Sequence, residues 1–426
     1  MDHVAPEMMR PEEWIAPGMD KVILTPEEIG CFNRDLRMGT AFGEDLFVSL
    51  DDAPDTFSRA EVRKMIGIYE APDPPGRFVG GKPTDRAYWE KVLANRALEL
   101  IPDEAAIRRG FSVRRGMINM FPAADFMGED ASERYCDLNT SSECMPFLPL
   151  LVIHESRDGE WAFCIFYNLA GWVRKECIAL CRDKEDWERR RRPGQVLTVC
   201  GRLLRLFDDP FCPELAGQLL PMGTHLPLVP PAEAPIYVRG RGTFGNYVAL
   251  LPVRGEDGMI RDEYFLIPVS EDVMPGLMPY TRENEIRQVF KLCGDVYGWG
   301  GAHNAGDCSG IIHEIFCCFG FVLPRGAAGE AGMEPALRTD VSGMPADQKR
   351  CLLEKVSPGA FLYMPGHIMI WLGMRGGRGY VISAAGSAVY GGELVPIRGV
   401  AVTELESVFR KNGASWLDSI TSVTEI

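Results

Sequence analysis

Residues 297–320 read YGWGGAHNAGDCSGIIHEIFCCFG, and this stretch decides how the C-terminal part of the chain folds. Its first half is rich in glycine and predicts a loop. In its second half apolar residues recur at helical spacing, and the pattern stops at Gly320. We therefore expect a loop that leads directly into a helix starting near Cys308.

Cys308 differs from the other cysteines by its position at this predicted helix start. Backbone N–H groups there lack partners, and the helix dipole favours negative charge. Both effects lower the pKa of a thiol and favour the thiolate, which is the nucleophile. The same N–H groups suit a developing oxyanion. Without a nearby base, a buried structural cysteine is the preferred interpretation.

A candidate base lies in residues 364–371, which read MPGHIMIW. In a strand beginning after Pro-Gly, His367, Met369 and Trp371 share one face. A histidine at the strand end that faces the helix of Cys308 would take the thiol proton. The alternative is a core histidine with satisfied hydrogen bonds. His313 lies about 140° around the helix from Cys308, so it points elsewhere.

The segment 271–426 combines helices with a later series of strands. A helix pattern begins at Thr281, and strands are predicted over 359–363, 367–373 and 380–384. Residues 374–379 predict the hairpin between the last two strands. Helices followed by a strand series indicate an α+β domain.

Three further segments precede this domain. Residues 1–110 carry helix starts near Thr25, Ser58 and Thr84, which predict a helical packing region. Residues 111–180 and 181–270 change to a period of two with tight turns, which predicts two small barrels. The arginine run 189–192 is interpreted as a solvated charged face in preference to a polyanion-binding site.

Composition and charge exclude several classes of function. The 426 residues are 46% hydrophobic and 25% charged, which is ordinary for globular domains. The net charge of −15 disfavours nucleic acid and anionic lipid as partners. The longest apolar run has nine residues, whereas a membrane span needs about 20. No signal peptide is recognised, which predicts a cytoplasmic protein, or a periplasmic or cell-wall protein if a signal was trimmed.

Cysteine spacing argues against a metal site. The thirteen cysteines include no Cys-x-x-Cys pair, so neither a zinc site nor a disulfide framework is expected. The thiols are interpreted as mostly small core residues in a reducing compartment. No cofactor is expected, and the oligomeric state is left open.

Four motifs in this order resemble the NlpC family of cysteine peptidases. These motifs are Tyr297-x-Trp299-Gly300-Gly301, Asp307-Cys308-Ser309-Gly310, Leu323-Pro324-Arg325 and Pro365-Gly366-His367. The family has a papain-like α+β core and cuts cell-wall peptides. The upstream chain resembles a subgroup in which a helical stabilising region and two bacterial SH3-like barrels precede the peptidase. The stretches that fit this subgroup are residues 121–122, 156–161, 171–173 and 222–228.

This resemblance implies a fold and a set of roles. The fold is multidomain α+β: a helical N-terminal region, two SH3-like barrels and an NlpC peptidase domain. Cys308 is implied as the nucleophile and His367 as the general base. The Cys308 backbone N–H and the Tyr297 hydroxyl are implied as oxyanion donors. The substrate-binding residues implied on this basis are Tyr297, Trp299, Asp307 and Ser309.

Two of these implied roles concern the bound substrate. In relatives that need a free N-terminal L-alanine, the residues matching Asp307 and Ser309 bind the ammonium group of the substrate. A tyrosine of the first barrel often walls the same pocket, and Tyr135 and Tyr167 are candidates for it.

One position departs from the family pattern. The third catalytic residue is usually a histidine shortly after the catalytic histidine, and Ser383 aligns with it here. A serine accepts one hydrogen bond from an imidazole, but weakly. Either Ser383 suffices, or Ser387 or a backbone carbonyl replaces it, or activity is reduced.

The implied activity is hydrolysis of the γ-D-glutamyl-L-diamino acid bond of peptidoglycan stem peptides with a free N-terminal L-alanine, as in muropeptide recycling. A catalytically weak or silent stem-peptide binding protein of the same fold is the alternative. An amidase or acyltransferase of this fold class is a third hypothesis. The diamino acid, lysine or diaminopimelate, stays open.

Overall fold

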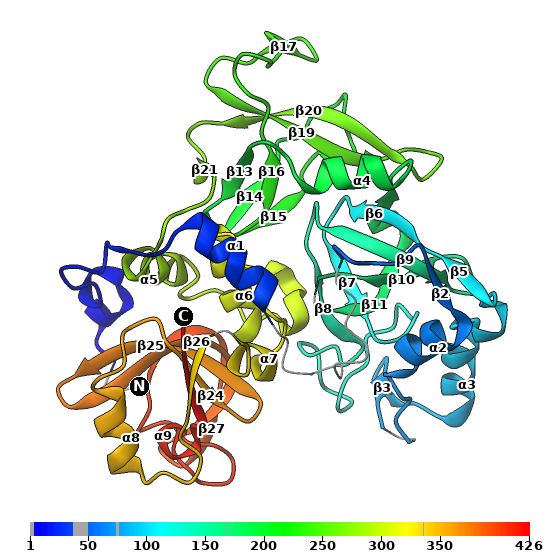
Figure 1. Ribbon diagram of the computed structural model, residues 1–426. Helices are drawn as coiled ribbons and strands as arrows, with labels where there is room; N and C mark the ends of the chain where they lie inside the picture. Colours follow the sequence, from blue (N-terminus) through cyan, green and yellow to red (C-terminus); the bar gives the residue numbers. More distant parts are fainter. Residues whose placement is uncertain (1–3, 37–49, 74–75, 168, 335) are drawn as a thin grey trace. The chain divides into compact units, whose positions relative to one another are not determined.

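The computed structural model describes residues 4–36, 50–73, 76–167, 169–334 and 336–426 (Figure 1). The chain divides into two compact units. The first unit combines residues 1–44 with residues 277–426, and the second spans residues 45–276. Residues 1–110, expected as one region, are thus shared between the units. The expected mixture of helices and strands is confirmed, and the four-segment division stays a proposal.

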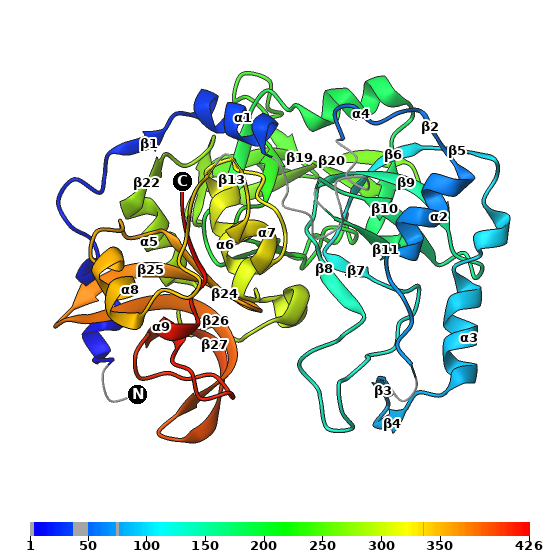
Figure 2. The same ribbon diagram turned by 60° about the horizontal axis from the view of Figure 1, so that its bottom comes forward.

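A six-stranded antiparallel sheet forms the centre of the first unit (Figure 2). Its order is β23-β28-β24-β25-β26-β27. The strands are β23 (Leu337–Asp340), β24 (Phe361–Met364), β25 (His367–Arg375), β26 (Arg378–Tyr390), β27 (Glu393–Glu404) and β28 (Ser422–Glu425). The three strands expected from the sequence correspond to β24, β25 and the first part of β26.

Helix α6 (Cys308–Cys318) lies against this sheet and confirms the predicted helix. It packs on β25 and β26, and Ile311, Ile312 and Ile315 are at most 1% exposed. The helix ends where Gly320 adopts a left-handed φ of +90°. The other helices of this unit's C-terminal part are α5 (Arg282–Lys291), α7 (Ala327–Ala331), α8 (Ala346–Leu353) and α9 (Trp416–Ser419).

The β25–β26 hairpin fixes which side chains meet across the two strands. Its two-residue turn is Gly376-Gly377, with φ of +56° and +78°, as a type I′ turn requires. Ile370 then pairs with Ile382. In this register Ser383 is a diagonal neighbour of His367 on the same face of the sheet.

The N-terminal segment belongs to the first unit. Its elements are η1 (Pro6–Met9), η2 (Pro11–Glu13), β1 (Val22–Leu24), which pairs with β22 (Tyr280–Thr281), and α1 (Pro26–Asp35). The Thr25 capping box that starts α1 confirms the sequence prediction. The Asn33 amide donates to the Gly320 carbonyl at 2.9 Å and accepts from the Val322 N–H at 3.0 Å. These hydrogen bonds hold the C-terminal part of α1 next to the C-terminus of α6.

The second unit begins with a seven-stranded sheet, ordered β12-β6-β9-β10-β11-β7-β8. Its strands are β6 (Arg108–Ser112), β7 (Gly116–Asn119), β8 (Thr140–Cys144), β9 (Pro149–Glu155), β10 (Trp161–Ile165), β11 (Ala170–Arg174) and β12 (Ile178–Leu180). Phe163 and Trp172 are fully buried in its core. Helices α2 (Arg59–Gly67) and α3 (Arg86–Asn95) precede it, capped by Ser58 and Asp85.

Smaller sheets complete the second unit. They are formed by β13 (Val196–Val199), β14 (Leu203–Arg205), β15 (Leu219–Pro221), β16 (His225–Pro227), β17 (Tyr237–Val238), β18 (Arg241–Gly242), β19 (Asn246–Arg254), β20 (Ile260–Pro268) and β21 (Val273–Pro275). Leu197, Leu220 and Phe265 are fully buried in one cluster. The remaining short elements are β2 (Thr56–Ser58), β3 (Phe78–Val79), β4 (Lys82–Pro83), η4 (Leu98–Leu100), β5 (Glu104–Ala106) and η5 (Lys175–Cys177).

The arginine run 189–192 lies at the end of α4 (Lys184–Arg191). Arg190 pairs with Asp186 and Asp262, and Arg191 pairs with Asp51. The side chain of Arg191 is only 4% exposed. The run is therefore engaged with carboxylates of the second unit.

Neither a membrane-spanning helix nor a disulfide occurs among the described residues. The described part of the chain contains no helix that is both long and apolar enough to cross a bilayer. It includes all thirteen cysteines, and no disulfide joins any of them.

Candidate active site

Asp307 organises the start of α6. It is the N-cap residue, and its Oδ1 accepts from the Gly310 backbone N–H at 2.8 Å and from the Ser309 hydroxyl at 3.1 Å. These bonds satisfy donors that a helix N-terminus otherwise leaves open. Cys308 is consequently the first residue of the helix.

Arg325 holds the same carboxylate from the opposite side. Its Nη1 donates to Oδ1 of Asp307 at 3.0 Å and its Nη2 donates to Oδ2 at 2.8 Å. Nη1 also donates to the Ser309 hydroxyl oxygen. The two charged side chains are 8% and 12% exposed, and a fork-to-fork pair of this kind is strong when buried.

The carboxylate of Asp307 is fully occupied. Besides these contacts, Oδ2 accepts from the Gly300 N–H at 2.9 Å. Five hydrogen-bond donors therefore contact one carboxylate, which offers about four lone-pair sites. Asp307 and Ser309 were expected to bind a substrate ammonium group. In this structure both contact Arg325, and Asp307 also contacts the loop; their role toward a substrate stays a prediction.

The glycine-rich loop has a shape that other residues cannot adopt. It contains η6 (Trp299–Asn304), in which Gly300 and Gly301 have φ of +57° and +92°. A Cβ on Gly298 would lie 2.1 Å from the Ala302 carbonyl oxygen. The loop thereby folds back onto Asp307 and carries Tyr297 and Trp299, both partly exposed.

The edge of the sheet supports the first part of this loop. The Tyr297 N–H donates to the Arg398 carbonyl at 2.9 Å, and the Gly294 N–H donates to the Val400 carbonyl at 2.8 Å. Arg398 and Val400 belong to β27, so the loop continues the sheet beyond its last strand. This pairing fixes the backbone on both sides of Tyr297.

Cys308 lies against the first residues of β25. The Ile368 backbone N–H is hydrogen-bonded to the Cys308 sulfur and acts to lower its pKa. Ile368 follows His367 directly in the chain. The packing of α6 on β25 thus brings the predicted nucleophile to the strand end that carries the predicted base.

His367 is oriented by two neighbours. Its Nε2 forms a hydrogen bond of 3.0 Å with the hydroxyl of Ser383, which is 2% exposed. Its ring packs on the Trp416 ring, with 5.2 Å between the centroids. Nδ1 is then the ring nitrogen that is available for proton transfer. Ser387, the alternative orienting residue, is exposed on the same strand.

The pKa values differ from the expectation drawn from the helix dipole. Burial and the Asp307 charge raise the pKa of the Cys308 thiol to about 12. Burial, with a smaller effect of Arg410, lowers the pKa of His367 to about 4. The expected lowering of the thiol pKa is therefore wrong, because burial outweighs the effect of the helix N-terminus.

Glu330 is a second buried carboxyl near this site. It is 0% exposed on α7, and neither carboxyl oxygen has a hydrogen-bond partner among the described residues. Burial raises its pKa well above the usual value, against the attraction of Arg325. The Glu330 charge in turn acts to raise the Cys308 pKa. Nothing in the sequence pattern signalled this residue.

The other candidate residues lie outside this constellation. The His313 Nε2 is 3.6 Å from the Cys317 sulfur, in agreement with its predicted direction away from Cys308. Arg325 was predicted only as part of a motif, and its pairing with Asp307 and the packing of Trp416 on His367 were not predicted from the sequence. Among the described residues, no three His, Cys, Asp or Glu side chains are grouped as a metal site.

Comparisons with known proteins describe the same architecture. Residues 128–174 match the family SH3 domain (SH3b1 type), within the segment expected as the first barrel. No curated protein matches the chain. The chain resembles the structure of a novel NlpC/P60 endopeptidase from Photobacterium damselae subsp. piscicida, with 18% identity, TM-score 0.74, and coverage of 97% of this chain and 96% of that chain.

A second solved structure is similar over a smaller part of the chain. It is an NlpC/P60 family protein from Bacillus cereus, with 13% identity and a TM-score of 0.50. The match covers 74% of this chain and 98% of that chain. At these identities the comparisons show the fold, which is the NlpC/P60 fold with a bacterial SH3 domain.

We expect Asp307→Asn to destabilise the protein by about 3–5 kcal/mol, because it leaves the buried Arg325 without its carboxylate. Denaturant unfolding measures this loss. Arg325→Gln alone should cost a similar amount, and the double variant should cost less than the sum. Strict additivity of the two changes would contradict the pairing.

Glu330→Gln should remove a pH dependence of stability. The folded chain keeps the Glu330 proton at pH values where the unfolded chain has lost it, because its pKa is raised from 4.5. The contribution of this group is therefore largest below pH 4.5 and falls as the pH rises toward the folded pKa. The variant should gain stability over wild type as the pH rises above 4.5, by at most about 1.4 kcal/mol per pH unit. Glu354→Gln, at an exposed position, is the control, and a parallel pH curve for Glu330→Gln would contradict this account.

Proposed function

We propose that this protein is a cysteine peptidase that hydrolyses the γ-D-glutamyl-L-diamino acid bond of peptidoglycan stem peptides. The observation that carries the proposal is the juxtaposition of Cys308, at the N-terminus of α6, with the start of β25, where His367 is bonded to Ser383. The NlpC/P60 fold supports it, because a structural match that covers 97% of this chain is to a protein described as an endopeptidase.

In the first step His367 accepts the thiol proton at Nδ1 while its Nε2–H donates to the Ser383 oxygen. The Cys308 sulfur attacks the amide carbonyl and forms a tetrahedral intermediate. The Cys308 backbone N–H and the Tyr297 hydroxyl stabilise its oxyanion. The imidazolium returns its proton to the leaving amine, and an acyl-enzyme remains. Water, deprotonated by His367, then releases the acyl group and restores the thiol.

Proton transfer accompanies the attack in this proposal. The thiol pKa of about 12 and the imidazole pKa of about 4 place both groups in neutral form at pH 7. A thiolate–imidazolium pair is thus not present in advance. Negative charge develops on sulfur only as the proton leaves, close to the backbone N–H groups that stabilise it.

Recognition of the substrate is assigned to the partly exposed side chains of the loop, Tyr297 and Trp299. For the proposed preference for a free N-terminal L-alanine, Asp307 and Ser309 are the proposed ammonium acceptors, and their contacts with Arg325 would have to rearrange when the substrate binds. Such a peptide is a fragment of wall turnover, so we place the reaction in muropeptide recycling, in the cytoplasm.

A second candidate function is stem-peptide binding without turnover. It is favoured by one observation: Ser383 replaces the histidine usual at the orienting position, and a serine hydroxyl is the weaker acceptor. The two candidates differ in whether Cys308 reacts.

The deciding experiment incubates the protein with L-Ala-γ-D-Glu-diaminopimelate and detects L-Ala-γ-D-Glu by mass spectrometry, with the lysine peptide in parallel. Wild type should release the dipeptide and Cys308→Ala should not, although it keeps its fold. Turnover by Cys308→Ala would remove the nucleophile assignment. No turnover by wild type, together with a Cys308 that resists alkylation at neutral pH, would favour the binding protein.

Ser383→Ala should lower kcat by about tenfold or more with little change in KM, because His367 loses the partner that orients it. Removing a charged orienting group costs about 10⁴ in another enzyme class, and a neutral hydroxyl contributes less. Ser387→Ala, on the same strand but exposed, is the matched control. Equal rates for both variants would show that Ser383 does not orient the base.

A further inference from the structure

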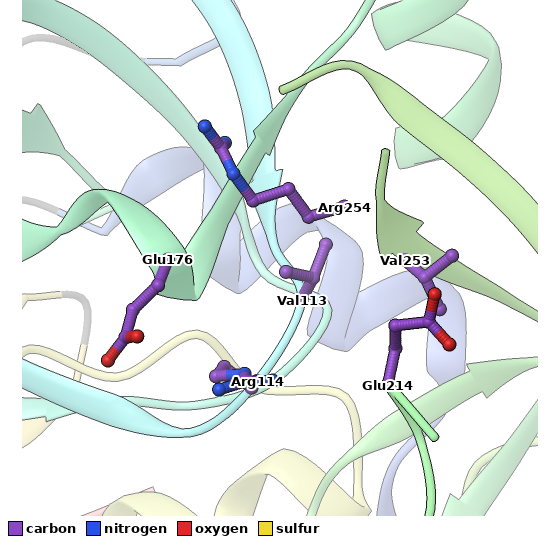
Figure 3. A pocket seen from close by; sticks show the side chains of 6 residues that line it. All are labelled: Val113, Arg114, Glu176, Glu214, Val253 and Arg254. Carbon is purple, nitrogen blue, oxygen red and sulfur yellow. The ribbon is translucent and has the colours of Figure 1, made fainter. Parts of the chain in front are cut away.

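A pocket of about 220 Å³ lies within the second unit (Figure 3). Its lining residues are Val113, Arg114, Glu176, Glu214, Val253 and Arg254. The first three belong to the part of the chain that forms the seven-stranded sheet, and the last three belong to the smaller sheets that follow. The pocket is thus built where two differently folded parts of one compact unit meet, a common position for ligand sites.

Hydrogen bonds across this junction hold the walls of the pocket in place. The Gln218 side-chain amide donates to the Val113 carbonyl at 3.3 Å and to the Glu214 carbonyl at 2.6 Å. The Arg254 guanidinium donates to the Ile178 carbonyl at 2.6 Å. The pocket is therefore formed before any ligand arrives, which lowers the entropic cost of binding.

The lining combines an apolar floor with charges of both signs. Val113 and Val253 are 4% and 1% exposed, and Figure 3 shows the four charged side chains around Val113. Two arginines and two glutamates make the formal charge of the lining zero. A simple anion would be repelled by both carboxylates, and a simple cation would be repelled by both guanidinium groups.

The four charged side chains differ in whether they form hydrogen bonds or ion pairs within the protein. Glu214 pairs with Arg261 at 2.8 Å, and Arg254 is bonded to backbone carbonyls. Arg114 and Glu176 are exposed, and no hydrogen bond or ion pair of either is recorded within the described residues. One guanidinium and one carboxylate of the same pocket are thus available to a ligand.

We propose that this pocket binds a small zwitterion, an amino acid or a dipeptide. The ligand carboxylate pairs with the Arg114 guanidinium, which suits it as a planar fork, and the ligand ammonium pairs with Glu176. A volume of about 220 Å³ is below the usual range for drug-sized ligands and fits a molecule of this size. The pocket lies in the second unit, whereas Cys308 belongs to the first, so this ligand is proposed in addition to the peptide substrate.

Isothermal titration of the full chain carrying Cys308→Ala tests the proposal without heat from hydrolysis. The probes are glycine, glycylglycine and L-alanyl-L-alanine, each also with the amine acetylated or the carboxylate amidated. At least one unblocked probe should bind at one site per chain. Blocking either end should weaken binding by about tenfold or more, because one charge-assisted contact is lost.

Variants locate the binding. Arg114→Ala and Glu176→Gln should each weaken binding of the unblocked probe by about tenfold or more, with unchanged melting temperature, because both side chains are exposed. Arg182→Ala, an exposed arginine outside the pocket lining, should bind as the parent does. The proposal is overturned if no unblocked probe binds, if blocked and unblocked probes bind equally, or if Arg114→Ala leaves the affinity unchanged.

Discussion

The buried pair between Asp307 and Arg325 is the constraint on which the candidate site depends. One carboxylate caps α6 through Gly310, anchors the glycine-rich loop through Gly300 and receives the guanidinium of Arg325. Three segments that are separate in the sequence therefore meet at a single group. Burying these charges is costly in itself, but the five donors around Asp307 compensate much of that cost. The position of Cys308 at the helix start is a consequence of this arrangement.

The pair also acts on the electrostatics of the site, because Asp307 raises the pKa of the Cys308 thiol more than Arg325 lowers it. A helix N-terminus stabilises a negative charge by about 0.3–1 kcal/mol at exposed positions. Burial opposes the charged form by up to about 3–5 pKa units, each equivalent to about 1.4 kcal/mol. Burial is the larger effect, which explains why the Cys308 thiol has a raised pKa despite its place on α6. A helix N-terminus lowers the pKa of an exposed cysteine thiol, but its effect is smaller than that of burial for a thiol packed against β25.

Local patterns predicted the elements of the site, and long-range contacts decided what the sequence could not show. Helix α6 and strand β25 follow from periodicity and from the Pro-Gly before His367, whereas Ser383 as the partner of His367 was implied by the family resemblance. The role of Arg325 does not follow from such patterns, because its partner lies 18 residues away across a loop. The bond between Asn33 and Gly320 spans 287 residues, so the attachment of the N-terminal segment to the C-terminal unit had no local signal. The direction of the thiol pKa shift likewise depended on packing.

Asp307 and Glu330 both act to raise the pKa of the Cys308 thiol, and the opposite effect of Arg325 is smaller. A stable thiolate would need a positive partner, and desolvation of the half-buried His367 lowers its pKa to about 4. The remaining stabilisation comes from oriented dipoles: the Ile368 N–H and the open N–H groups of α6. Dipoles fixed in this way act on charge that develops during a reaction and need no reorganisation. The site is thus better suited to stabilising negative charge that develops on sulfur and oxygen during a reaction than to stabilising a permanent thiolate.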